Sequence, residues 1–185
     1  MSTLTIIALC VLCGLFSLFY ASNHMGFMAQ KPEHYIGKGT DFDIRRELNG
    51  PILCEGVIYG PLGRVQTRFV ANMNAEWRGD QGHMTEEFRY DSGHTLNREW
   101  TLSVKNDATF DATAPDIIGT GKGVHSGSSV KLNYDLKLPE ETGGHVLNVT
   151  DWMYLMENGT IMNRSQMRKF GIKVGELVAT MRKAA

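Results

Sequence analysis

The sequence predicts an all-β fold, a single antiparallel meander barrel of about eight to ten strands that follows one N-terminal transmembrane helix. Three observations support this fold class. The first thirty residues contain no Asp, Glu, Lys or Arg. The remainder is dominated by alternating apolar and polar residues, the pattern of half-buried strands. Tight-turn dipeptides recur at intervals too short for crossover helices, so consecutive strands must pair antiparallel.

The apolar N-terminal segment runs from Leu4 to Ala21. As a helix it is about 27 Å long, enough to cross the hydrocarbon core of a bilayer. We therefore predict a transmembrane anchor or uncleaved signal at residues 1–22, a linker at residues 23–40 and the barrel domain at residues 41–185. A cleaved signal peptide is the alternative. It is disfavoured because no basic residue precedes the segment and Phe19 and Tyr20 stand where a cleavage site needs small residues.

The clearest predicted strand covers residues 130–138, where five apolar residues alternate with four polar ones. Similar runs predict nine further strands, at residues 53–59, 65–77, 84–90, 96–104, 109–114, 117–124, 146–156, 160–164 and 172–181. So many antiparallel strands either fold into a sandwich or close into a barrel, which removes the exposed edges.

Three shorter segments carry local predictions of their own. Residues 42–48 and 165–169 are expected to form helical turns that plug or strap a barrel end. The glycine-rich stretch Gly119–Gly123 follows a strand and opens no helix. It therefore indicates a bulge or a tight bend rather than a phosphate-binding loop.

Composition excludes several classes of function. The net charge is -1, with both signs interspersed and no basic cluster, so nucleic-acid binding is not expected. The chain has no nucleophile elbow, zinc-protease, P-loop or dinucleotide motif, so we predict neither a catalytic residue nor a cofactor, and an enzyme is the less favoured class. The six histidines are scattered, four of them beside turn glycines, and predict no metal site. Cys54 is the single cysteine of the domain, which excludes a disulfide within it.

Strand 146–156 contains the most informative charged residue, Asp151. It shares one face with four apolar side chains, whereas Trp152 and Tyr154 lie on the other face. If the apolar face is the interior, burial of an unpaired carboxylate is costly, so a cation such as Arg164 or Arg98 should lie nearby. Two alternatives remain open: a structural ion pair that closes the barrel, and a pair that orients a ligand in a pocket.

The predicted ligand is a membrane lipid or another apolar small molecule held next to the membrane, which the chain would contact through residues 4–21. In this hypothesis aromatic side chains line the site and charged ones orient the ligand, although aromatics at such positions also form plain core. The predicted ligand-binding residues are Asp151, Trp152, Tyr154, Arg164, Arg98, Trp100 and Tyr134. Two alternatives are an accessory enzyme of membrane-lipid modification, with Asp151 as general acid or base, and a structural envelope protein with a filled barrel.

Several separated motifs resemble those of one family: Phe42-Asp43-Ile44-Arg45, Leu48-Asn49-Gly50-Pro51, Gly56-Val57-Ile58, and residues 88–100, 116–121, 151–155 and 163–171. The chain is identified by them as similar to the family known as domain of unknown function 3833, which is common in Gram-negative bacteria and includes lipoproteins. The resemblance implies an envelope protein with a lipocalin-like barrel and no established activity. This sequence departs from the lipoproteins, because Cys10 and Cys13 each follow a leucine rather than a small residue.

The location of the domain follows from two arguments that disagree. The family resemblance implies a membrane-anchored protein with its domain in the periplasm, attached to the inner membrane. The basic residues Lys31, Lys38, Arg45 and Arg46 all follow the apolar segment and none precede it. The positive-inside rule then places the domain on the cytoplasmic side, which stays the alternative.

Overall fold

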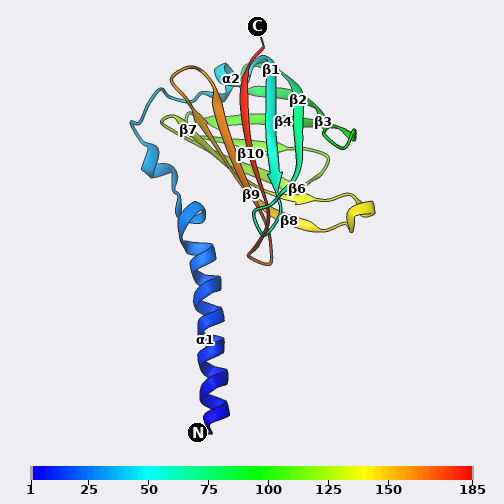
Figure 1. The fold of residues 1–185 in the computed structure, drawn as a ribbon. Coiled ribbons are helices and arrows are strands. Elements are labelled where there is room, and N and C mark those ends of the chain that lie inside the picture. Colours follow the sequence, from blue (N-terminus) through cyan, green and yellow to red (C-terminus); the bar gives the residue numbers. More distant parts are fainter. Residues whose placement is uncertain (1, 185) are drawn as a thin grey trace.

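The computed structural model describes residues 2–184 and consists of a long N-terminal helix attached to a β-barrel (Figure 1). The helices are α1 (Thr3–His24) and α2 (Ile44–Glu47), with short 3-10 turns η1 (Gly26–Ala29), η2 (Pro32–Tyr35) and η3 (Glu140–Thr142). The strands are β1 (Gly50–Tyr59), β2 (Val65–Arg78), β3 (Gln81–Tyr90), β4 (Thr95–Asn106), β5 (Thr109–Thr113), β6 (Ile117–Ser126), β7 (Ser129–Lys137), β8 (Val146–Leu155), β9 (Ile161–Lys169) and β10 (Ile172–Lys183).

The ten strands form one closed meander, so the predicted all-β barrel is confirmed. Each strand pairs antiparallel with its neighbour along the chain, and β1 pairs with β10 from Ile52 opposite Lys183 to Tyr59 opposite Glu176. This last pairing closes the barrel. Because side chains alternate along each strand, one face of every strand points into the barrel and supplies the core.

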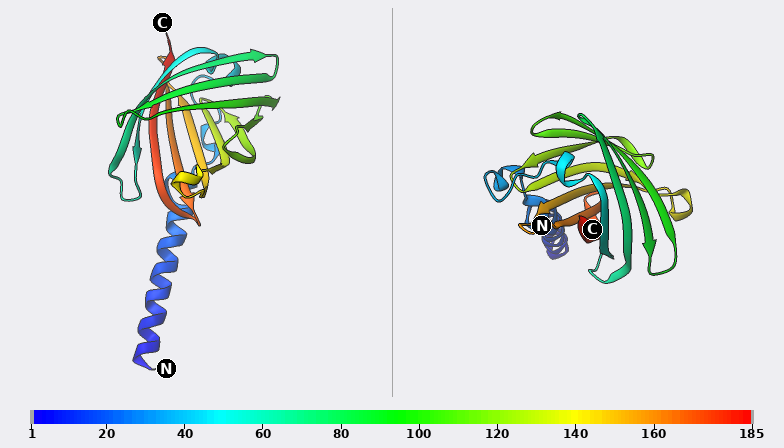
Figure 2. Two further views of the ribbon diagram at one scale, coloured as in Figure 1. Left: turned by 90° about the vertical axis from the view of Figure 1, so that its right-hand side faces the viewer. Right: turned by 90° about the horizontal axis from the view of Figure 1, so that it is seen from above.

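Helix α1 stands apart from the barrel core and exposes its apolar side chains along its length. Its N-terminus is capped by the Ser2 hydroxyl, which accepts a hydrogen bond from the Thr5 backbone N–H at 3.3 Å. Its mean hydropathy reaches 2.4, and it is long and apolar enough to cross a membrane or to serve as a signal sequence. The views in Figure 2 show it leading away from the barrel end where the β9–β10 hairpin lies.

The opposite end of the barrel is closed by the segment before β1, as the sequence predicted for residues 42–48. Phe42, Ile44 and Leu48 are almost completely buried, with Ile44 at 0% exposure. The Leu48 carbonyl accepts a hydrogen bond from Trp77 Nε1 at 2.7 Å, which ties the segment to β2. Seen from above in Figure 2, α2 lies across this end of the ring of strands. We call residues 42–48 the plug.

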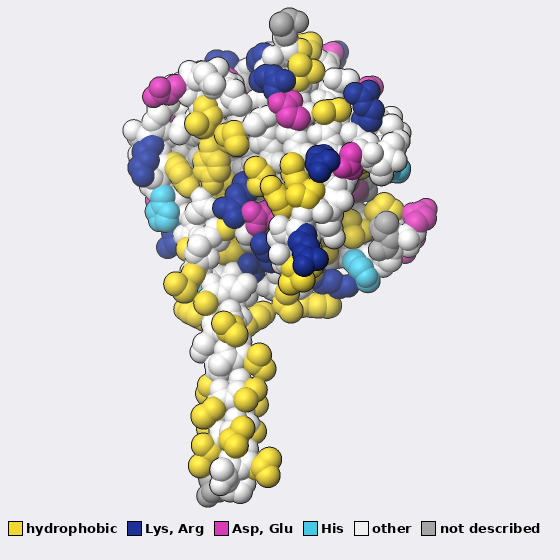
Figure 3. Space-filling view, in the orientation of Figure 1, with side chains coloured by type: hydrophobic (Ala, Val, Ile, Leu, Met, Phe, Trp, Pro, Cys, Tyr) yellow, Lys and Arg dark blue, Asp and Glu magenta, His cyan; other side chains and the backbone are white. Residues whose placement is uncertain are grey.

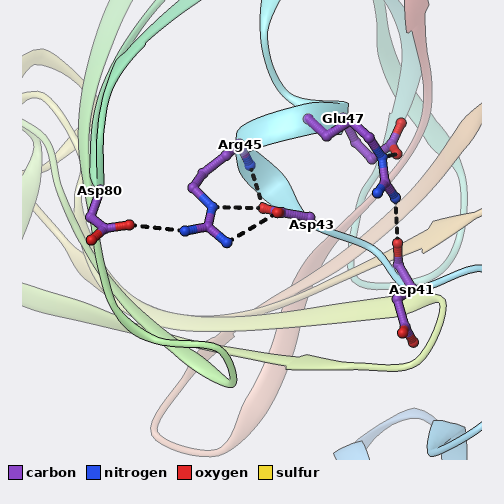
Figure 4. A network of polar contacts seen from close by, with 6 residues as sticks. Asp41, Asp43, Arg45, Glu47 and Asp80 are labelled. Carbon is purple, nitrogen blue, oxygen red and sulfur yellow. Dashed lines mark hydrogen bonds and ion pairs between the residues drawn. The ribbon is translucent and has the colours of Figure 1, made fainter.

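A polar network connects the plug to the β2–β3 turn (Figure 4). Asp43 caps α2 by accepting from the Arg45 backbone N–H at 2.9 Å. The Arg45 guanidinium then bonds Asp43 Oδ1 at 3.1 Å and Asp80 Oδ1 at 2.9 Å. Exposed ion pairs of this kind add little stability, so burial of the plug's apolar side chains is what holds it in place.

Two local predictions have different outcomes. The bulge expected at Gly119–Gly123 is confirmed, because the β6–β7 register shifts between Ile118 and Lys122 and Gly119 has a φ of +71°. The helical turn expected at residues 165–169 is wrong, since this stretch belongs to β9. Pairing with β8 on one side and β10 on the other satisfies its backbone groups and overrides the local helix preference.

The plug yields a first prediction. Ile44→Ala removes a fully buried side chain and is expected to lower the free energy of unfolding by about 2 to 5 kcal/mol, because the cavity left behind cannot collapse onto the strands. Urea unfolding of the detergent-solubilised full chain measures the loss. As a control, Ile36→Ala, at a position that is 69% exposed, should change the value by less than about 0.5 kcal/mol. Equal effects of the two substitutions would contradict the plug.

Candidate functional site

The barrel encloses a cavity with two adjoining chambers. The deep chamber, next to the plug, has a volume of about 120 Å3. The mouth chamber, at the other end, has a volume of about 770 Å3. The two chambers share six wall residues: Phe69, Phe88, Arg98, Tyr134, Ser165 and Leu177. A ligand that enters through the mouth chamber therefore meets the polar side chains at this junction.

Small residues on some strands make room for aromatic rings from their neighbours. A Cβ atom on Gly56 would lie 2.6 Å from Phe69 Cζ, so the Phe69 ring occupies the space beside β1 that a side chain would fill. The Phe69 ring packs against Phe88 and Tyr90, with ring centroids 5.3 and 6.2 Å away. This aromatic cluster forms one wall of the mouth chamber. The wall is therefore aromatic and apolar.

A charged cluster lies at the junction of the chambers, on β3, β4 and the residue before β6. Glu86 and Arg98 are direct cross-strand partners, and their closest oxygen and nitrogen atoms are 3.8 Å apart. Arg98 Nη2 donates to Asp116 Oδ1 at 3.0 Å, and Arg98 Nε lies 2.8 Å from Oδ2 of the same carboxylate. The guanidinium also lies 4.6 Å from the centre of the Trp100 ring. Arg98 thus links two acids and an aromatic ring.

Asp151 projects from β8 into the deep chamber, on the interior face that the sequence pattern indicated. Its Oδ1 atom accepts hydrogen bonds from Ser165 Oγ at 2.8 Å and from Asn163 Nδ2. The side chain is only partly buried and lines the wall of the deep chamber. Within residues 2–184 it makes no ion pair, so the predicted pair with Arg98 or Arg164 does not form. Neutral hydrogen-bond donors from β9 take its place.

Burial sets the protonation of the ionisable side chains around the cavity. Loss of solvation raises the pKa of Asp151, and the hydrogen bonds from Ser165 and Asn163 offset only part of that effect. Burial likewise raises the pKa of Glu86, against the opposing charge of Arg98. Burial raises the pKa of Tyr134, with the nearby Asp151 charge adding to the effect. The Cys54 thiol, whose pKa burial raises to about 12, stays protonated.

The predicted site residues divide into two groups. Asp151, Arg98, Trp100 and Tyr134 all line the deep chamber, and Arg98 and Tyr134 also line the mouth chamber. The Trp100 and Tyr134 rings meet edge to face, with centroids 5.4 Å apart. The structure thus brings four of the seven predicted residues together around one cavity.

The other three predicted residues, Trp152, Tyr154 and Arg164, lie on the outer face of β8 and β9, where linker residues contact them. The Tyr35 ring packs against Trp152 at 5.3 Å and Tyr154 at 5.6 Å between centroids. Tyr35 and Tyr154 both donate hydrogen bonds to Gln30 Oε1 at 2.6 Å. The Arg164 guanidinium stacks 4.9 Å over Phe27. These residues hold the linker instead of facing the cavity, because adjacent strand positions point to opposite faces.

Sequence reasoning missed several polar wall residues, among them Glu86, Asp116, Asn163 and Ser165. Glu86 had a detectable signal, since it stands between Met84 and Phe88 on the apolar face of its strand, as Asp151 does on β8. Asp116 lies in the turn before β6 and carries no such pattern. Among the described residues no group of three or more His, Cys, Asp or Glu side chains is placed to hold a metal ion.

Comparison with known proteins places the chain in a family. It belongs to the family described as "Protein of unknown function (DUF3833)", which matches residues 22–183. No curated protein sequence matches this chain.

Two solved structures share the fold. An S-type phycobiliprotein lyase, CPES from Guillardia theta, has a TM-score of 0.59 and 8% sequence identity, over 77% of this chain and 91% of the lyase. Rv2717c from M. tuberculosis has a TM-score of 0.54 and 16% identity, over 76% of this chain and 94% of that chain. At these identities the likeness concerns the barrel fold alone.

The protonation of Asp151 gives a second prediction. A raised pKa in the folded chain means that the folded state holds the proton more tightly, so this contribution to stability is present at low pH and is lost as the pH rises above the unfolded value. The contribution of Asp151 to the free energy of unfolding of the wild type should therefore fall as the pH rises from about 4, the ordinary value for an aspartate, toward neutral. Asp151→Asn mimics the neutral acid and should fall less, as measured by urea unfolding across this range.

Asp111→Asn is the control with the opposite sign. The hydrogen bond from Lys122 lowers the pKa of Asp111, so its contribution is present at neutral pH and is lost as the pH falls. Its removal should leave the Asp151 contribution above about pH 4 unchanged. A pH dependence of Asp151→Asn equal to that of the wild type would contradict a raised pKa at Asp151.

Proposed function

We propose that this domain binds a membrane lipid or another apolar small molecule inside its barrel. The observation that carries the proposal is the mouth chamber of about 770 Å3, which is open at one end and walled mainly by apolar side chains. Small-molecule sites are typically clefts of about 300 to 1,000 Å3 with an apolar wall and a few polar groups. The cavity has both properties, which argues against a purely structural barrel filled by its own side chains.

The polar groups at the junction of the chambers suggest how such a ligand would be oriented. The raised pKa of Asp151 favours its protonated form, which carries an O–H donor, and the Tyr134 hydroxyl, whose pKa is also raised, remains a donor. Arg98 adds a positive charge that two acids already balance. The ligand that fits best has an apolar body in the mouth chamber and a hydrogen-bond acceptor, such as a carbonyl or ester oxygen, at the junction.

The position of the barrel next to a membrane would favour a lipid as its ligand. An apolar α1 that anchors the chain keeps the barrel next to a reservoir of acyl chains. We place the domain in the periplasm, attached to the inner membrane, in line with the envelope location that its family resemblance implies. The methionines of the wall, Met73, Met84, Met153, Met167 and Met181, provide flexible apolar contacts that suit acyl chains of different shape.

A third prediction tests the ligand site. Leu177 points inward between the two chambers, so Leu177→Trp should fill the passage and weaken binding of a fluorescent fatty acid by about tenfold or more in delipidated protein. Val178→Trp places the same side chain on the outer face of β10 and should leave the affinity unchanged. Native mass spectrometry of the detergent-extracted wild type should show a co-purifying lipid. Absence of saturable uptake by the wild type would refute the proposal.

A second candidate function, an accessory enzyme of membrane-lipid modification, is favoured by one observation. Asp151 faces the cavity without an ion-pair partner among the described residues and has a raised pKa, the properties of a general acid. The fourth prediction separates the candidates. Under the enzyme hypothesis, a strain carrying Asp151→Asn loses a lipid product that the wild type makes, whereas a binding protein leaves the lipid profile unchanged. Mass spectrometry of total lipid extracts measures the difference.

A further inference from the structure

Two hairpins at the open end of the barrel expose large apolar side chains. The β1–β2 and β9–β10 hairpins lie at the lower edge of the barrel, on the side from which α1 leaves (Figure 1). Leu62 is 88% exposed, Phe170 83%, Ile172 60% and Val65 49%. Single exposed apolar residues are ordinary, but four on two neighbouring hairpin tips form a surface that favours an apolar partner. We call residues 60–65 and 168–173 the rim hairpins.

Phe170 has a left-handed backbone conformation that is unfavourable for a bulky side chain. Residues Phe170 and Gly171 form the two-residue loop between β9 and β10, with φ values of 52° and 77°. A loop with two positive φ angles favours Asn or Gly at its first position, because a bulky side chain is strained there. A phenylalanine at this position packs little and is strained. Backbone strain at an exposed residue points to a role beyond folding.

The charges of the rim hairpins are all positive. Residues 60–65 and 168–173 contain Arg64, Arg168, Lys169 and Lys173 and no Asp or Glu. The Lys169 ammonium lies 5.6 Å from the centre of the Phe170 ring. In Figure 3 apolar and basic side chains lie side by side at the lower edge of the domain, next to α1. Apolar tips flanked by cations match the bilayer interface, where acyl chains lie beneath phosphate groups.

Contacts with α1 set the β9–β10 hairpin at the level of the helix's C-terminal end. A Cβ atom on Gly171 would lie 2.9 Å from Phe19 Cζ, so the hairpin tip rests on the Phe19 ring. Arg168 Nη2 donates to the Ser22 carbonyl at 2.7 Å, and Arg168 Nη1 donates to Asn23 Oδ1 at 2.9 Å. If residues 4–21 cross the bilayer, the tip of this hairpin lies at its surface.

The linker between α1 and the plug packs on the barrel and is not a flexible connection. Residues between α1 and the plug pack on the outer face of β8 and β9 through Phe27, Gln30 and Tyr35. The Ser126 hydroxyl on β6 also donates to the Pro32 carbonyl at 2.5 Å. The orientation of the barrel relative to α1 is thus set by two groups of contacts: those between the β9–β10 hairpin and α1, and those between the linker and the outer face of the barrel.

We propose that the rim hairpins dock on the phospholipid bilayer that α1 enters, with Leu62, Phe170 and Ile172 in the interface and Arg64 and Lys169 on the headgroup phosphates. Docking holds the mouth of the barrel close to the membrane surface. The surface adds a second membrane contact to α1 and is independent of what the cavity binds. Docking with no ligand uptake, or uptake with no docking, would therefore separate this inference from the proposed function.

The experiment measures the depth of single positions in the reconstituted full chain. Cys10→Ala and Cys13→Ala remove the two exposed thiols, and buried Cys54 is checked for labelling in this background. A cysteine is then placed at Leu62, Ile172 or Met156 and labelled with an environment-sensitive fluorophore. Met156 is the matched control, because it is an exposed apolar residue in the β8–β9 turn at the opposite end of the barrel. Vesicles contain phosphatidylcholine and phosphatidylglycerol, with or without nitroxide-labelled lipid.

The fifth prediction is that nitroxide lipid quenches the labels at positions 62 and 172 and leaves the label at 156 unquenched. Phe170→Asn, which suits the positive φ, should stabilise the fold to urea and yet reduce quenching at position 62. The matched substitution Met156→Asn should leave that quenching unchanged. Quenching at 172 without quenching at 62 would mean that α1 alone holds one hairpin at the membrane, and it would overturn the proposal. So would equal quenching at 62 and 156.

Discussion

Pairing of β1 with β10 is the constraint on which the rest of this structure depends. Eight consecutive partners, from Ile52 opposite Lys183 to Tyr59 opposite Glu176, join the first strand to the last. Closure leaves no free edge in the sheet and gives every strand an inside and an outside. The cavity, the plug and the outer face under the linker all follow from this division. Without it the same strands would form an open sheet with no interior.

The interior of the barrel is not uniformly apolar, and its buried charged groups are stabilised in two different ways. Arg98 is balanced by Asp116 and Glu86, whereas Asp151 is held by neutral donors from β9. Burial disfavours the charged form of a carboxylate that has no cation beside it. The pKa of Asp151 is raised for this reason. Buried ionisable groups of this kind cost stability, and clusters of them in a cavity commonly mark a functional site.

The two ends of the barrel differ in chemistry. At one end the plug buries Phe42, Ile44 and Leu48 and closes the interior. The other end is open, and its rim hairpins carry exposed apolar side chains and cations next to α1. Between them the linker packs Tyr35 against Trp152 on the outer wall. The open end is therefore where the proposed ligand would enter and where the proposed docking on a membrane would occur.

The sequence by itself predicted ten strands, their antiparallel order, the plug and the apolar strand face that carries Asp151, because alternation and turn chemistry depend on residues close together in the chain. It missed the second half of β9, where pairing with both neighbouring strands overrode the local preference for a helical turn. It also brought Arg98, Trp100 and Tyr134 into the candidate site. Only the tertiary structure decided that Arg98 pairs with Asp116, 18 positions away, and that the linker covers Trp152. Such contacts depend on strand register and on barrel closure, and no local pattern in the chain records them.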